Sequence, residues 1–137
     1  MSDSMGEREY HARRIAEFRA NGGKLAPPLD TSPLVVLTTI GAKSGQPRAT
    51  MMSYTRDGER YVVVTASDTP QWFRNLVAHP EVTVEVGGEQ FAAHATVAVG
   101  AERTRLFDQH ASIRPNFIEY QRQAAQPLNV VALTRAE

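Results

Sequence analysis

The chain has 137 residues, 42% of them hydrophobic, with 15 basic and 15 acidic side chains and no cysteine. This size fits one globular domain, 1–137, that can bury a core. The zero net charge argues against a general nucleic-acid binder, and the lack of cysteine excludes disulfides and zinc–cysteine sites. No apolar run is long enough to span a membrane and the N-terminus has no signal-peptide core, so we expect a cytoplasmic protein without a stable membrane anchor.

The first predicted element is an N-terminal helix within residues 1–22, followed by a connector over 23–33. His11, Ile15 and Phe18 recur at helical spacing and form a narrow apolar stripe on this helix. The polar remainder of the helix is mixed in charge. We therefore expect the helix to pack against its own domain.

The middle and C-terminal parts of the chain alternate short apolar runs with turn residues. Predicted strands are Leu34–Thr39, Ala49–Arg56, Arg60–Thr65, Val82–Val86, Phe91–Val99 and Leu128–Thr134. Predicted helices are Gln71–Ala78, Gly100–His110 and a last one from Pro115 to about Ala124. Hairpin connections dominate this order. The prediction is a mainly β fold, a small six-stranded β-barrel decorated by the N-terminal helix and two or three further helices.

A basic loop, Gly41-Ala42-Lys43-Ser44-Gly45-Gln46-Pro47-Arg48, separates the first two predicted strands. Its glycines allow a sharp turn, while Lys43, Ser44 and Arg48 offer two cations and a hydroxyl to an anion. The loop lacks the spacing of a nucleotide-binding P-loop. It is either an anion cradle or an ordinary solvated turn.

Catalytic side chains are hard to find in this sequence. The histidines are scattered without metal-ligand spacing, so no metal is expected, and no serine lies in a nucleophile elbow. The acidic pair Asp57 and Glu59 lies in a turn and is interpreted as solvated. If the protein is an enzyme, a cofactor should therefore supply the chemistry. Met51 and Met52 could line a slot for a flat ring, or they could both belong to the core.

Several motifs together resemble those of the deazaflavin-dependent nitroreductase family of actinobacteria. The matching segments run in order from about residue 17 to 134. They are Phe18–Lys24, Leu37–Arg48, Tyr54–Gly58, Trp72–Leu76 with His79-Pro80, Val84–Gly88 and Tyr120-Gln121. The basic loop and the Trp-aromatic-x-Asn-Leu helix are specific when they occur together.

This resemblance implies a split β-barrel related to FMN-binding and flavin-reductase barrels, which often dimerise. It also implies coenzyme F420, a deazaflavin with a phospholactyl-oligoglutamate tail, with the tail on the basic loop and the ring beside the following strand. The implied cofactor-binding residues are Ala42, Lys43, Ser44, Arg48, Ala49, Thr50, Met51, Met52, Thr65, Ala66, Ser67, Trp72, Phe73 and Asn75. The implied substrate side comprises Arg114, Phe117 and Tyr120, with Tyr120 as the candidate catalytic donor.

The expected function is F420-dependent transfer of a hydride to a small electron-poor molecule, such as a quinone, an enone or a nitroaromatic compound. Two alternatives stay open: a non-catalytic protein that binds F420 or a fatty acid, and an FMN-dependent barrel enzyme. The segment Ser67–Pro70 keeps both open, because it is short, lacks glycine and places Asp68 where the family often has a base. A homodimer is a further expectation.

Overall fold

A curled antiparallel sheet forms the body of the protein. The structure is a computed structural model that describes residues 3–27 and 33–136, with side chains described from residue 9 onward. The strands are β1 (Leu34–Ile40), β2 (Pro47–Ser53), β3 (Thr55–Asp57), β4 (Arg60–Val64), β5 (Glu81–Val86), β6 (Glu89–Val97) and β7 (Val130–Arg135). They lie in the order β2-β1-β5-β6-β7-β4-β3, and each neighbouring pair is antiparallel.

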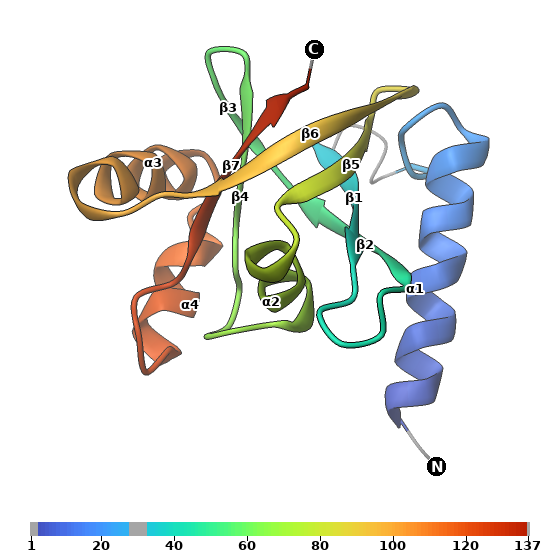
Figure 1. The fold of residues 1–137 in the computed structure, drawn as a ribbon, viewed down its shortest axis with the longest axis horizontal. Helices are drawn as coiled ribbons and strands as arrows, with labels where there is room; N and C mark the ends of the chain where they lie inside the picture. Colours follow the sequence, from blue (N-terminus) through green and yellow to red (C-terminus); the bar gives the residue numbers. More distant parts are fainter. Residues whose placement is uncertain (1–2, 28–32, 137) are drawn as a thin grey trace.

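The sheet has seven strands in the described part of the chain, so the prediction of six was wrong. The expected strand Ala49–Arg56 is divided at Tyr54 into β2 and β3. β2 pairs with β1 at one edge of the sheet, whereas β3 pairs with β4 at the other edge. A straight strand could not reach both partners. Because a single residue joins the two edge strands, the sheet must curl until its edges approach each other, as Figure 1 shows.

Four helices surround this sheet: α1 (Asp3–Ala20), α2 (Gln71–Ala78), α3 (Gly100–Ile113) and α4 (Asn116–Gln123). In Figure 1, α1 stands beside β2, α3 and α4 lie on the opposite side, and α2 lies between them. α3 extends one turn further than the predicted end at His110. Part of the connector, residues 28–32, lies outside the described residues. Within the described part, no helix combines the length and the apolar character needed to cross a bilayer.

Both faces of β1, β4 and β7 are largely buried, which explains their continuous apolar runs. On β1, Val35 and Leu37 point into a cluster that includes Phe73 and Leu76 of α2. Val36, between them, instead packs with Ile15 and Phe18 of α1 and with Leu25. A third cluster joins Val62 and Val64 of β4 to α3 and α4. α2 therefore covers one face of the sheet, and the other helices cover the opposite face.

An ion-pair network ties the β3–β4 hairpin to α3, and it corrects the interpretation of Asp57 as merely solvated. Arg105 reaches Asp57 at 3.1 and 3.2 Å and Glu102 at 3.1 and 3.2 Å. Arg60 pairs with Asp57 and lies 2.8 Å from Glu102. Hydrogen bonds from Arg105 and Arg60 lower the pKa of Asp57 to about 2. We call these four residues the hairpin–helix network.

Candidate functional site

The basic loop between β1 and β2 is a closed turn. The Gly41 N–H donates to the Gln46 carbonyl at 2.8 Å, and the Gly45 N–H donates to the Gly41 carbonyl at 3.0 Å. The Ser44 hydroxyl accepts the Gln46 N–H at 3.1 Å and lies so close to Gly41 that an added Cβ there would be 2.4 Å from it. Gly45 has a φ of 71°, a conformation that favours glycine. These glycines hold Lys43 and Ser44 in a fixed turn at the surface.

Asn75 of α2 fastens this turn to the rest of the protein. Its side chain is 1% exposed, and its Oδ1 accepts the Ala42 N–H at 3.0 Å and the Gln71 Nε2–H at 2.9 Å. Its Nδ2 donates to the Thr39 hydroxyl at the end of β1, at 3.1 Å. Its amide is therefore engaged within the protein. It positions the loop relative to α2.

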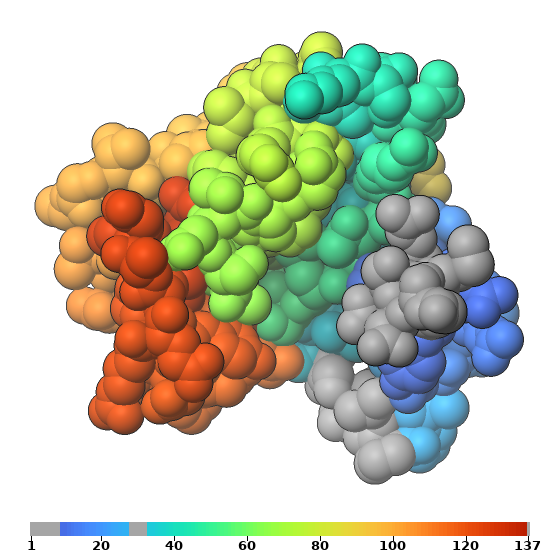
Figure 2. Space-filling model, turned by 90° about the horizontal axis from the view of Figure 1, so that it is seen from below, coloured from blue at the N-terminus to red at the C-terminus, as the bar shows by residue number. Residues whose placement is uncertain are grey.

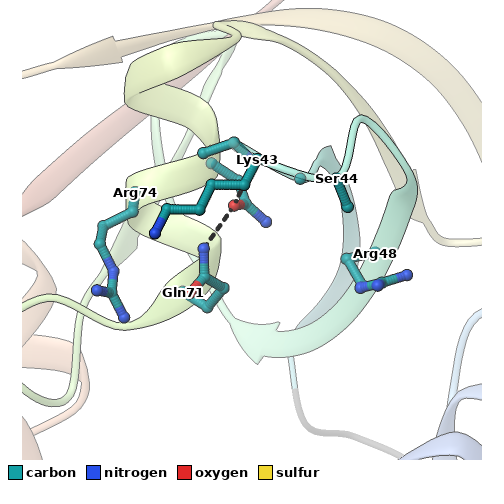
Figure 3. A pocket seen from close by; sticks show the side chains of 8 residues that line it. Lys43, Ser44, Arg48, Gln71 and Arg74 are labelled. Carbon is teal, nitrogen blue, oxygen red and sulfur yellow. Dashed lines mark hydrogen bonds between the residues drawn. The ribbon is translucent and has the colours of Figure 1, made fainter.

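A cavity of about 380 Å³ lies between the loop and α2. Figure 3 shows Lys43 reaching from the loop toward the α2 side, where Arg74 lies, whereas Arg48 points away on the other side. We call this the cation-lined cavity. Its lining residues are Gly41, Ala42, Lys43, Ser44, Arg48, Gln71, Arg74 and Asn75.

The three cations of this cavity have no carboxylate partner in the described part of the chain. Among the residues that the structure describes, no ion pair involves Lys43, Arg48 or Arg74. The lining contains no acidic side chain either. Among the described residues, Arg48 donates to the carbonyl of Pro47 alone, at 3.3 Å. Positive charge that faces a cavity without compensation favours the binding of an anion.

A second cavity, of about 200 Å³, joins the segment after β4 to α4. We call it the tyrosine cavity, because Tyr120 lines it together with Ala66, Ser67, Asp68, Gln123 and Ala124. Tyr120 is 36% exposed, and its hydroxyl accepts a hydrogen bond from Asn116 Nδ2 at 3.2 Å. In Figure 2, α2 lies between the basic loop and α4 on one face of the molecule.

Asp68 faces this second cavity and is not a lining residue of the cation-lined one. Its carboxylate accepts the Gln126 N–H at 3.2 Å, and its carbonyl accepts Asn129 Nδ2–H at 2.8 Å. Thr65, which is buried, also bonds to Asn129: its hydroxyl accepts the Asn129 N–H at 3.0 Å. The segment Ser67–Pro70, which resembled the family least, is thus fixed through Asp68 to the chain that precedes β7.

The other two residues expected on the substrate side lie elsewhere. Phe117 is 5% exposed and packs in the cluster beneath α3 and α4, where its ring meets Tyr120 edge-on at 5.1 Å. Arg114 is half-buried at the end of α3, where its N–H donates to the His110 carbonyl at 2.8 Å. Of this set, the structure brings Tyr120 alone to the tyrosine cavity.

The residues expected beside the cofactor ring divide between two faces of β2. Ala49 and Met51 pack toward α1, and the Met51 N–H donates to His11 Nε2 at 3.0 Å. Met52 packs toward the cluster under α2, which also holds Phe73 and the half-buried Trp72. Thr50, which precedes the two methionines, is partly exposed. The two methionines therefore do not form one common slot.

One buried histidine was not anticipated as a core residue. His110 is fully buried, and its Nδ1 lies 2.9 Å from the Thr55 hydroxyl. Burial, together with the smaller effect of the Arg114 charge, lowers the pKa of His110 to about 4. The imidazole is therefore neutral, and it serves as packing against Phe117 at 4.6 Å.

Arg74 and Gln71 were missed in the sequence analysis. Arg74 and Asn75 lie three and four residues after Gln71 on α2, and these spacings place each of them beside Gln71 on the helix surface. Since Asn75 was already a candidate, the i, i+4 spacing could have predicted Gln71, whereas Arg74 is next to Asn75 in the chain and does not follow from that spacing.

The chain matches a known protein family over most of its length. Residues 11–135 fit the family described as F420H(2)-dependent quinone reductase. An F420H(2)-dependent quinone reductase of Mycobacterium tuberculosis is 32% identical over 128 residues, which cover 88% of this chain and 86% of the relative. This agrees with the deazaflavin-dependent family expected from the motifs.

Solved structures of related proteins share the fold. A structure described as an F420-H2 dependent reductase has a TM-score of 0.66 and 29% identity, over 74% of this chain and 93% of its own. One described as a domain-swapped dimer has a TM-score of 0.69 and 27% identity, over 96% and 99% of the two chains. A haem storage protein of Vibrio cholerae, with 19% identity over 93% of this chain and 91% of its own and a TM-score of 0.62, shows likeness of fold alone. The chain belongs to the F420H(2)-dependent quinone reductase family, and it is an oxidoreductase whose cofactor is coenzyme F420.

Proposed function

We propose that this protein uses reduced F420 to reduce small quinones, and that the cation-lined cavity binds the tail of the cofactor. The observation that carries the proposal is the set of three cations, Lys43, Arg48 and Arg74, which line one cavity without a carboxylate partner among the described residues. The tail of F420 bears a phosphate and glutamate carboxylates. These residues fit such a group, because guanidinium and ammonium donors bind oxyanions through charge-assisted hydrogen bonds.

The supporting residues have separate tasks in this proposal. Lys43 and Ser44 present an ammonium group and a hydroxyl to the tail, and Arg48 adds a planar fork of donors. Asn75 does not need to touch the cofactor, since its amide already holds the loop and α2 together. The curled sheet is interpreted as a split β-barrel, with the cofactor ring along β2 and residues 65–67 near it.

The tyrosine cavity is the proposed substrate side. Reduced F420 supplies a hydride when it is bound. A quinone that gains a hydride also needs one proton to become a hydroquinone. The Tyr120 hydroxyl, partly exposed and oriented by Asn116, would donate a hydrogen bond to the quinone oxygen on which negative charge develops.

Turnover of a water-soluble benzoquinone by the protein with reduced F420 tests this function. We expect oxidation of the cofactor with saturation in quinone, and a decrease of kcat/KM by about 10- to 100-fold in Tyr120→Phe. Tyr10→Phe is the matched control, because Tyr10 is an exposed tyrosine on α1. F420 binding without turnover would favour the non-catalytic alternative, and turnover with FMN in place of F420 would favour the FMN enzyme. Nitroaromatic and enone substrates can be compared in the same assay.

The homodimer also stays a proposal. Its support is the relative described as a domain-swapped dimer, which matches nearly the full length of both chains. Light scattering on the purified protein measures the mass directly. A mass near the 15.1 kDa of one chain would contradict it.

A further inference from the structure

Arg74 differs from its neighbours on α2 in what it contacts. Asn75 is buried and bonded to the loop, and Gln71 donates to Asn75. Arg74 lies on the same side of α2 and lines the same cavity, yet it is exposed and has no ion-pair partner in the described part of the chain. None of its contacts with described residues gives it a structural task.

Other arginines show what a structural task looks like in this protein. Arg19 forms two hydrogen bonds to the Glu85 carboxylate, at 2.8 and 2.7 Å, and so joins α1 to β5. Arg103 donates twice to the Leu128 carbonyl, at 3.1 and 2.7 Å, and joins α3 to the segment before β7. Each links two elements, whereas Arg74 forms no ion pair with a described residue and lines the cavity instead.

The position of Lys43 makes this placement of Arg74 informative. Lys43 comes from the loop and reaches toward α2 over the same cavity, on the side where Arg74 lies (Figure 3). Two cations that face one cavity repel each other, and no acidic side chain of the lining offsets the repulsion. An oxyanion between them would replace repulsion by two attractions, so the pair is arranged for a ligand that bridges loop and helix.

We infer that Arg74 is a further cofactor-binding residue, which contacts an oxyanion of the F420 tail from α2 while Lys43 contacts it from the loop. This rests on the proposed function of the cation-lined cavity. The oxyanion is a phosphate or a glutamate carboxylate, since both fit the guanidinium fork. A cavity with binding residues on both walls holds the tail between two elements, and affinity then depends on the tail as well as on the ring.

Binding measurements on Arg74→Gln test this inference without any turnover. Three ligands are titrated by fluorescence: F420 with several glutamates, the phospholactyl form without glutamate, and the deazaflavin without a tail. At low salt we expect Arg74→Gln to weaken binding of oligoglutamyl F420 by about fivefold and to leave the tail-less deazaflavin unchanged. A loss that extends to the phospholactyl form assigns the phosphate, and a loss confined to the glutamylated form assigns a carboxylate.

Arg13→Gln is the control variant, because Arg13 is an exposed arginine on α1 that forms no ion pair with a described residue and lies outside the cavity. It should bind all three ligands as the unmodified protein does. Equal affinity of Arg74→Gln and the unmodified protein for oligoglutamyl F420 would overturn the inference alone. An equal loss for the tail-less ligand would do the same. A failure of the unmodified protein to bind F420 at all would instead contradict the proposed function.

Discussion

Two groups of charged residues in this protein use similar side chains in opposite ways. In the hairpin–helix network, Arg60 and Arg105 each contact two carboxylates, and the groups satisfy one another. The cation-lined cavity is lined by three cations, and no carboxylate among the described residues pairs with them. The first arrangement is complete in the folded protein and stabilises it. The second is incomplete until an anion binds, and this difference separates a structural charge cluster from a binding site.

The largest expected effect comes from Asn75, which serves both stability and binding. In Asn75→Ala the buried Thr39 hydroxyl and the Ala42 N–H lose their partner, so we expect a decrease of about 2 kcal/mol in the free energy of unfolding. F420 affinity should fall by about tenfold, because the loop loses its fixed position. Urea unfolding and a fluorescence titration measure the two losses. Gln71→Ala, which removes only an exposed partner of Asn75, should lose much less of both; equal losses in the two variants would contradict this role.

Asp57→Asn should affect stability without affecting binding. It removes the charge that Arg60 and Arg105 share, and we expect a decrease of about 1 kcal/mol in the free energy of unfolding. F420 affinity should stay unchanged, since the network lies outside the cavity lining. If Asp57→Asn lost F420 affinity but kept its free energy of unfolding, the assignment of the hairpin–helix network to stability would be contradicted.

Lys43→Gln should affect binding without affecting stability. We expect about fivefold weaker F420 binding at low ionic strength and a free energy of unfolding within about 0.5 kcal/mol of the unmodified protein. The reason is that Lys43 has no ion-pair partner to lose in the described structure. The same unfolding and titration experiments measure it, and destabilisation as large as that of Asp57→Asn would show that Lys43 has a structural role.

The smallest effect concerns the change in the free energy of unfolding at acidic pH. The pKa of Asp57 is lowered from 3.8 to about 2, so its contribution is complete above pH 4 and is lost as the pH falls toward 2. The stability difference between the unmodified protein and Asp57→Asn should fall to about half near pH 3. Urea unfolding at pH 7, 4 and 3 measures it. A difference that grows on acidification would contradict the ion-pair assignment.

Local patterns predicted the elements well, and long-range contacts explain where they failed. The loop, the helix Gln71–Ala78 and the strand ends follow from turn residues and periodicity. The break at Tyr54 could not be predicted locally, because it arises from pairing with β1 on one side and β4 on the other. Likewise, the Arg105 partner of Asp57 lies 48 residues away in the chain.

The candidate site was predictable to a similar extent. Lys43, Ser44, Arg48 and Asn75 were expected together, and the structure places them around one cavity. The missing information was which charges stay unpaired, since that depends on the whole fold; for this reason Arg74 was not anticipated. Phe117 shows the same limit, because helical spacing predicts a shared face but cannot tell whether that face meets a cavity or the core.

The central claim is that the unpaired cations of the cavity hold the anionic tail of F420. Its most direct test is the salt dependence of binding by the unmodified protein, with oligoglutamyl F420 and the tail-less deazaflavin side by side. Between about 0.05 and 0.5 M NaCl we expect the dissociation constant of F420 to rise by about tenfold or more, and that of the tail-less ligand to change little. Equal salt dependence for the two ligands would contradict the claim.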